Sequence, residues 1–147
     1  MKTKSIAKYI KVLDKSMGYY LDRQLADYQI SKNQIEILHH LYHQGGISQQ
    51  QLGTELMLDK ITVTKRLKGL VKAGYIEKRQ SSEDGRIKKI YLTTRGEEIQ
   101  SVLTDILTET AALLTAGITA EQEKLLRKLL ARMTDNIYGV VSELRHE

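Results

Sequence analysis

The chain repeats one helix-start pattern four times, each time directly before a run with apolar residues three and four positions apart. In this pattern Ser or Thr is followed three residues later by Glu or Gln. The hydroxyl accepts a hydrogen bond from a first-turn amide, and the longer side chain reaches back to the cap. One copy is a weak signal, but four copies, each before an apolar periodic run, predict that most of the chain is helical. The copies are Ser31–Gln34, Ser48–Gln51, Thr94–Glu97 and Thr119–Gln122.

Apolar periodicity and glycine stops set the expected elements. Asp59 adds a fifth candidate for a helix N-cap, and turn formers at 81–85 separate two short β-branched runs. The expected helices are 5–28, 32–44, 49–56, 60–73, 95–115 and 120–145, and the expected strands are 75–80 and 86–92. The predicted fold is therefore mainly α with a small β-hairpin wing. From this order of elements we predict a winged helix-turn-helix lobe at 31–94, with an N- and C-terminal helical dimerisation region at 1–30 and 95–147.

The dimerisation region is predicted from apolar stripes on the first and last expected helices. Apolar residues recur there at helical spacing, from Ile6 to Tyr28 and from Leu125 to Leu144. Helices with this much Leu and Ile need a surface to pack on, and a second copy of the chain is the simplest one. We therefore expect a homodimer.

The composition excludes several classes of protein. Cysteine is absent, which removes disulfides, thiolate zinc sites and thiol redox sensing. No apolar run reaches the length of a membrane span, and the basic N-terminus lacks the apolar core of a signal peptide. We therefore expect no membrane association and a cytoplasmic location. The sequence has no serine-hydrolase elbow, phosphate loop, dinucleotide fingerprint or HExxH motif, so we expect no enzyme and no cofactor.

Positive charge is concentrated in one segment. Residues 54–96 contain eleven Lys or Arg and five Asp or Glu, a net charge of +6, although the whole chain carries only +5. A concentrated basic surface indicates an anionic partner, with double-stranded DNA the leading candidate. The rival hypothesis is a winged-helix module that binds another protein. Salt separates the two, because phosphate contacts make DNA affinity fall steeply with salt.

The expected helix at 60–73 is the second of a closely spaced pair, as a helix-turn-helix requires. On a wheel of about 100° per residue, its core side carries Val63, Leu67, Leu70 and Val71. The alternative is an ordinary amphipathic helix with a solvated lysine face. The face opposite the core carries Ile61, Thr62, Lys65, Lys68, Gly69 and Lys72.

Several residues of this face suit a major groove. Ile61 is apolar on a polar face, which makes sense if it meets thymine methyl groups. Thr62 offers both a hydroxyl and a methyl group, and Lys65 can reach guanine acceptors or a phosphate. Arg66 lies at the flank, where a backbone phosphate is the nearer partner.

The hairpin that follows can reach the adjacent minor groove. Arg86 stands at its tip, and a guanidinium suits the negative potential of a narrow A·T-rich groove. Asp84 can hydrogen-bond Arg86 and set its direction. The alternative is a plain Asp-Gly turn beside a solvated charge. The complete set of predicted DNA contacts is Gln49, Lys60, Ile61, Thr62, Thr64, Lys65, Arg66, Lys68, Asp84, Arg86 and Lys88.

Three stretches resemble the MarR family of bacterial transcription regulators. Asp84-Gly-Arg86, five residues and then Leu92-Thr93 is similar to the family's D-x-R-x(5)-L-T wing signature. LVKAGYI at 70–76 resembles the end of the family's recognition helix, and TRGEE resembles the start of its long fifth helix. The resemblance implies an obligate dimer that binds a pseudo-palindromic operator, usually as a repressor. It also implies base or phosphate contacts from Thr62 and Lys65, and a minor-groove role for Arg86 with Asp84 as its partner.

The family resemblance also implies a small aromatic or anionic effector, bound between the dimerisation and DNA-binding lobes. Tyr9, Tyr20 and His39 would lie near such a pocket, although core or interface roles are open alternatives for all three. His39 and His43 are four apart on a helix, as zinc ligands can be, with Glu36 on nearly the same face. The favoured alternative is that these histidines complement the helix C-terminal dipole, so we predict no metal site.

Overall fold

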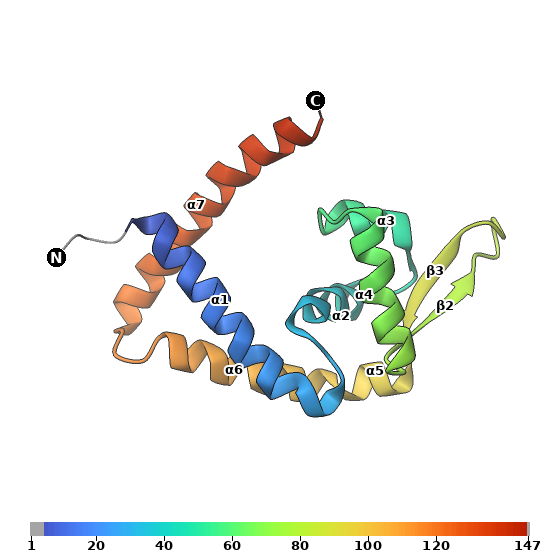
Figure 1. Cartoon of the computed structure of the whole chain (residues 1–147), viewed down its shortest axis with the longest axis horizontal. Helices are drawn as coiled ribbons and strands as arrows, with labels where there is room; N and C mark the ends of the chain where they lie inside the picture. Colours follow the sequence, from blue (N-terminus) through green and yellow to red (C-terminus); the bar gives the residue numbers. More distant parts are fainter. Residues whose placement is uncertain (1–4, 147) are drawn as a thin grey trace. The chain divides into compact units, whose positions relative to one another are not determined.

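The computed structural model describes residues 5–146 and is mainly helical with one small sheet (Figure 1). This confirms the predicted fold class. The elements in chain order are α1 (Ile6–Leu25), a 3-10 helix η1 (Ala26–Tyr28), α2 (Lys32–His43), β1 (Ile47–Ser48), α3 (Gln49–Glu55), α4 (Lys60–Lys72), β2 (Ile76–Gln80), β3 (Lys88–Leu92), α5 (Thr94–Glu98), α6 (Gln100–Leu114) and α7 (Ala120–Arg145).

Most of the predicted helix caps form. At the start of α7, Thr119 Oγ1 accepts from the Gln122 amide at 3.2 Å, and Gln122 Oε1 accepts from the Thr119 amide at 3.0 Å. Before α2, the Gln34 side chain accepts from the Ser31 amide at 2.9 Å. Asp59 caps α4, because its Oδ1 accepts from the Thr62 amide at 2.8 Å. These contacts are local, which is why the sequence pattern predicts them.

The predicted cap at Thr94 is wrong by one residue. The N-cap of α5 is Thr93, whose Oγ1 accepts from the Gly96 amide at 3.0 Å and donates to the Gly74 carbonyl at 2.6 Å. Gly96 is required here, since a Cβ at this position would overlap the backbone carbonyl oxygen of Tyr75. The contact with Gly74 joins segments far apart in sequence, so the spacing pattern, which favours Thr94 because of Glu97, could not indicate it.

The sheet has three antiparallel strands in the order β1-β3-β2. The hairpin pairs Ile76 with Leu92 at its base and Gln80 with Lys88 toward its tip. The sequence predicted only these two strands. Ile47 pairs with Ile90, and the two-residue β1 was missed because it is too short to show a period of two.

The described chain divides into two compact units, with the boundary after Thr110 and therefore inside α6. The first unit holds the hydrophobic core, in which α2, α4 and the sheet bury aliphatic side chains. The expected helix at 95–115 is two helices, α5 and α6, which meet at Ile99. No helix of residues 5–146 is both long and apolar enough to cross a membrane. The fully buried core side chains include Leu25, Ile37, Leu38, Leu52, Val63, Leu67, Leu70, Tyr75, Ile76 and Ile90.

Candidate nucleic-acid interface

A tight turn sets α4 against α3. Met57 adopts φ +55°, a left-handed conformation that costs a non-glycine residue on the order of 1 kcal/mol. The Leu58 amide then donates to the Gly53 carbonyl at 2.9 Å. A Cβ on Gly53 would lie 3.2 Å from Val63 Cγ2, so the glycine lets the two helices approach closely. Figure 1 shows α3 beside α4, with the β2–β3 hairpin extending past them.

The exposed face of α4 largely matches the helical wheel. Val63, Leu67 and Leu70 are buried, and Ile61 is 82% exposed. The prediction that Val71 is a core residue is wrong, because its side chain is 41% exposed. The exposed or partly exposed predicted contacts on α4 are Lys60, Ile61, Thr62, Thr64, Lys65, Arg66 and Lys68.

Gly69 belongs to a helix contact, which corrects its assignment to the open face. A Cβ at Gly69 would lie 2.5 Å from the Gln34 side-chain nitrogen. Gln34 Nε2 also donates to the Arg66 carbonyl at 3.3 Å. The glycine therefore lets α2 approach α4 at the turn that includes Arg66, which is a partly buried residue.

Asp59 organises the first turn of α4. Its Oδ2 accepts from Thr62 Oγ1 at 2.7 Å, in addition to the cap on the Thr62 amide. These backbone and side-chain hydrogen bonds from Thr62 lower the pKa of Asp59, because they favour its charged form. The Thr62 hydroxyl thus donates its proton to Asp59 and keeps its methyl group and its two oxygen lone pairs for an outside partner.

Gln49 contacts both α4 and the wing. Its Nε2 donates to Thr64 Oγ1 at 2.7 Å, and its Oε1 lies 3.4 Å from Lys78 Nζ on β2. The Thr64 hydroxyl in turn donates to the Lys60 carbonyl at 2.7 Å. Two predicted contact residues, Gln49 and Thr64, are therefore bonded to each other. Sequence spacing contains no signal for this contact.

The wing tip has the predicted acid–base pair. Arg86 Nε and Nη2 donate to the two Asp84 carboxylate oxygens at 3.2 and 3.4 Å. The Arg86 backbone amide also donates to Asp84 Oδ1 at 3.0 Å. The backbone and side-chain bonds from Arg86 lower the pKa of Asp84. The Arg86 side chain is nevertheless 92% exposed, so it is directed by Asp84 without being covered.

The other wing cations differ in their surroundings. Lys88 is exposed at the start of β3, opposite Gln80. Arg79 forms an ion pair with Glu77, and its Cζ lies 4.4 Å from the centre of the Tyr91 ring. Arg79 is therefore engaged within the protein, which the sequence did not indicate.

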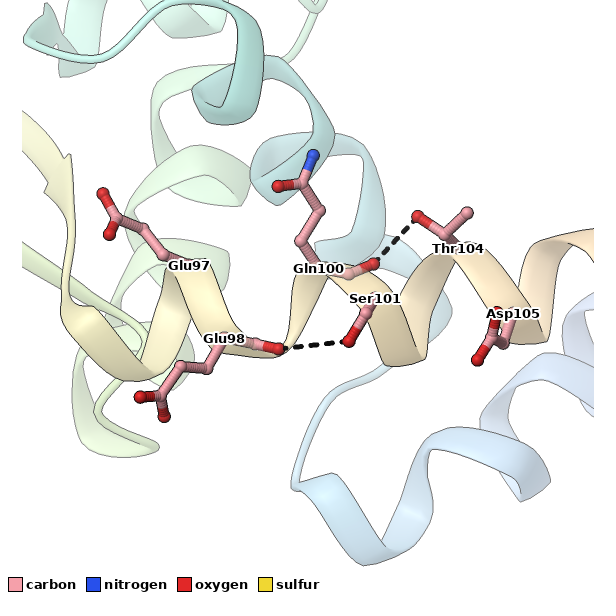
Figure 2. Close-up of a pocket in the computed structure, with 6 residues that line it drawn as sticks. All are labelled: Glu97, Glu98, Gln100, Ser101, Thr104 and Asp105. Carbon is pink, nitrogen blue, oxygen red and sulfur yellow. Dashed lines mark hydrogen bonds between the residues drawn. The ribbon is translucent and has the colours of Figure 1, made fainter.

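The predicted effector contacts do not line either of two surface cavities in the first unit. Tyr9 and His39 are exposed and Tyr20 is partly buried. The smaller cavity, of about 400 Å³, is lined by polar side chains along α5 and α6, and Figure 2 shows these side chains. The larger cavity, of about 620 Å³, lies between the end of α2, the sheet and α5. It is lined by Leu41, Tyr42, Gly45, Arg79, Tyr91, Leu92, Glu97 and Gln100.

One side chain of the larger cavity is chemically distinctive. The Tyr42 hydroxyl donates to the Gly96 carbonyl at 2.6 Å. Burial, and secondarily the neighbouring Tyr75, raise the pKa of Tyr42 to about 12. The phenol therefore stays protonated and acts as a link between α2 and α5.

The histidines of α2 contact protein side chains, which bears on the zinc-site alternative raised for them. His39 and His43 stack edge to face with ring centres 4.8 Å apart, and His40 Nε2 lies 2.7 Å from a Glu55 carboxylate oxygen. Within residues 5–146, no three His, Asp or Glu side chains are grouped closely enough to hold a metal ion.

Comparisons with known proteins agree with this geometry. Residues 30–88, which span α2 to the start of β3, match the family model described as the MarR family. The chain is 37% identical over 112 residues to the uncharacterized HTH-type transcriptional regulator YdgJ of Bacillus subtilis, covering 76% of this chain and 68% of that protein.

Solved structures share the fold. A MarR transcriptional regulator from Methanosarcina mazei superimposes with a TM-score of 0.85 at 26% identity, over 92% of this chain and 97% of that one. S. aureus MepR, solved as a complex with DNA, is similar in fold, with a TM-score of 0.82 at 24% identity over 91% and 99% of the two chains. The chain belongs to the MarR family and is a transcriptional regulator with a DNA-binding winged-helix fold, not an enzyme.

Proposed function

We propose that the chain is a homodimeric, sequence-specific repressor that binds a pseudo-palindromic operator and is released by a small-molecule effector. The observation that carries the proposal is the exposed surface formed by α4 and the wing. It presents an uncovered Ile61 and an uncovered Arg86 directed by Asp84. Since the proposed partner is chromosomal DNA, the cytoplasm is the proposed location.

The recognition helix α4 enters the major groove in this proposal. Ile61 meets thymine methyl groups. Thr62 presents its methyl group to thymine and its oxygen lone pairs to a base-edge amino group, while a phosphate contact would take the hydroxyl proton away from Asp59. Lys65 contacts guanine acceptors or a phosphate. The other predicted cations of α4, namely Lys60, Arg66 and Lys68, neutralise backbone phosphates. These contacts fix the orientation of the helix but carry little sequence information.

The wing enters the adjacent minor groove. Arg86 is the inserted cation, and Asp84 holds its guanidinium in direction before DNA arrives. This preorganisation lowers the ordering cost of the contact. Lys88 lies at the edge of the hairpin, within reach of the phosphates that border the groove. The narrow groove of A·T-rich flanks attracts arginine most strongly, so the flanks should contribute to specificity.

A second copy of the chain covers the exposed apolar stripes. On α1, Ile6, Tyr9, Ile10 and Leu13 are exposed. The structure describes all of α7, and no residue of this helix is buried. Its exposed apolar side chains recur at helical spacing. Contiguous apolar surface of this kind marks an association site. A twofold dimer would bring two recognition helices about 34 Å apart, to match half-sites about 10 bp apart. The exposed apolar side chains of α7 include Leu125, Leu126, Leu129, Leu130, Ile137, Tyr138, Val140 and Leu144.

Repression and release complete the proposal. A dimer bound across a promoter blocks access of RNA polymerase, and a small aromatic or anionic effector would favour a dimer whose lobes no longer match the half-site spacing. Tyr9, Tyr20 and His39 remain the proposed effector contacts. The exposure of Tyr9 and His39 leaves them available to a ligand or to the second chain.

The test is fluorescence anisotropy against the duplex upstream of the protein's own gene, with a scrambled duplex of equal length as control, at about 150 mM salt. The proposal expects tight binding to the native duplex alone and a steep loss of affinity as salt rises. Equally weak binding to both duplexes, or an affinity that salt hardly changes, would contradict it. The second result would favour a protein-interaction module.

A further inference from the structure

We propose that Gln49 is a positioning residue that holds the wing in place relative to the recognition helix, instead of contacting DNA itself. The inference rests on the proposed function and deepens it, because it assigns how the two DNA-reading elements act together. Gln49 is the first residue of α3, so it is fixed by the helix that packs against α4.

The contact with α4 fixes the orientation of the amide. The Thr64 hydroxyl uses its proton on the Lys60 carbonyl, at 2.7 Å, so it faces Gln49 with a lone pair. Only the nitrogen of the Gln49 side chain can donate to that lone pair, and it lies 2.7 Å away. The amide oxygen is therefore turned to the opposite side.

The contact with the wing requires the same orientation. Lys78 Nζ lies 3.4 Å from Gln49 Oε1, and an ammonium can only donate. This second contact is longer and weaker than the first. Lys78 pairs with Ile90 in the middle of the hairpin, so the amide ties the wing ladder to α4. Because an amide is neutral, it leaves the charge of Lys78 available to a phosphate.

The link matters because β1 holds the hairpin only through β3. β1 pairs with β3 at Ile90 and Lys89, in the middle of the hairpin, and β2 lies on the other side of β3. Gln49 adds a contact from α3 to β2 itself, so without Gln49 the hairpin would have more freedom relative to α4. Binding would then have to restrict that freedom before Arg86 could reach its groove. Loss of the Gln49 side chain should therefore reduce mainly the part of the DNA affinity that comes from the wing.

The experiment is a double-mutant cycle measured by anisotropy on the native upstream duplex. We expect Gln49→Ala to weaken binding about 3- to 10-fold, which corresponds to one or two hydrogen bonds. In an Arg86→Ala background the same change should cost less than about twofold, since the wing contact is already lost. Thr64→Val should cause part of the loss alone and none in the Gln49→Ala background. Gln50→Ala, at the neighbouring exposed glutamine of α3, is the matched control and should bind like the wild type.

A direct DNA contact by Gln49 gives a different result. The fold-loss of affinity from Gln49→Ala would then be the same in the wild-type and Arg86→Ala backgrounds, and that outcome would overturn the positioning role. A measurement without DNA tests the positioning role separately from the proposed DNA-binding function. Backbone ¹⁵N order parameters across residues 78–90 should fall in Gln49→Ala and stay unchanged in Gln50→Ala. Unchanged order parameters in Gln49→Ala would refute the link even if the protein bound no DNA.

Discussion

Replacing Arg86 with alanine tests the wing at its tip. Two guanidinium nitrogens donate to the carboxylate of Asp84 at 3.2 and 3.4 Å, while 92% of the Arg86 side chain is exposed. The side chain is directed but supports no packing. We therefore expect the free energy of unfolding to change by less than about 0.5 kcal/mol, so that any loss of DNA binding reflects the lost contact.

The size of the effect follows from the dimer. Each wing would lose one cation, so a dimer with two bound wings would lose two. If both neutralise phosphate charge, the slope of log affinity against log salt becomes shallower by about 1.8. A contact worth about 1 kcal/mol in each wing adds to about 2 kcal/mol, or about a 30-fold loss of affinity at moderate salt.

The assay compares two duplexes that share the half-sites and differ only in having A·T-rich or G·C-rich flanks. Anisotropy titrations from about 50 to 300 mM salt give the affinity and the salt slope for each. Arg86→Lys is the matched control, because it keeps the charge but not the planar guanidinium. We expect Arg86→Lys to keep most of the salt slope and to lose flank preference, and Arg86→Ala to lose both. If Arg86→Ala retains wild-type affinity and flank preference, the wing does not read the minor groove.

Four further predictions follow from other parts of the chain. Gly96→Ala should lower the free energy of unfolding by about 3 kcal/mol in denaturant titrations, because its Cβ would overlap the Tyr75 carbonyl oxygen; a neutral effect would contradict the packing. Tyr42 has a folded pKa of about 12 against an ordinary value of 10.0, so the unfolded chain loses its proton first as pH rises. Stability from Tyr42 should be complete below pH 10.0 and fall toward pH 12, and unfolding of Tyr42→Phe should show a weaker pH dependence in that window; equal pH dependence would refute it. Ile61→Ser should weaken discrimination of thymine from uracil in the half-site by about 1 kcal/mol, whereas undiminished discrimination in the variant would exclude a methyl contact. Leu129→Asp should shift the protein from dimer to monomer in sedimentation velocity, and an unchanged dimer would move the interface away from that part of α7.

The sequence predicted most of the fold because the deciding contacts are local. Asp59 and Thr119 cap their helices with side chains that reach only three residues along the chain. The Asp84–Arg86 pair was also predictable, since its members are two residues apart at a turn. At Thr93 and Thr94 the local pattern favoured Thr94, because Glu97 follows it by three residues, but the N-cap is Thr93, which also donates a long-range hydrogen bond to Gly74.

The remaining differences come from contacts between elements. The wheel placed Val71 in the core and Gly69 outside, because an angular position does not say which neighbouring helix lies where. Gly69 faces α2, while Val71 remains exposed. The bond from Gln49 to Thr64 joins α3 to α4 and is invisible to spacing. The contact of the Arg79 guanidinium with the Tyr91 ring joins β2 to β3 and is likewise invisible to spacing.

Selection of bound duplexes from a random DNA library tests the central proposal most directly. The purified protein is incubated with the library at about 150 mM salt, bound duplexes are recovered over several rounds, and the enriched sequences are aligned. We expect an inverted repeat with half-sites centred about 10 bp apart, thymines within the half-sites and A·T-rich flanks beneath the wings. Absence of an enriched motif, or a single asymmetric site, would contradict a dimer that reads DNA through α4 and the wing.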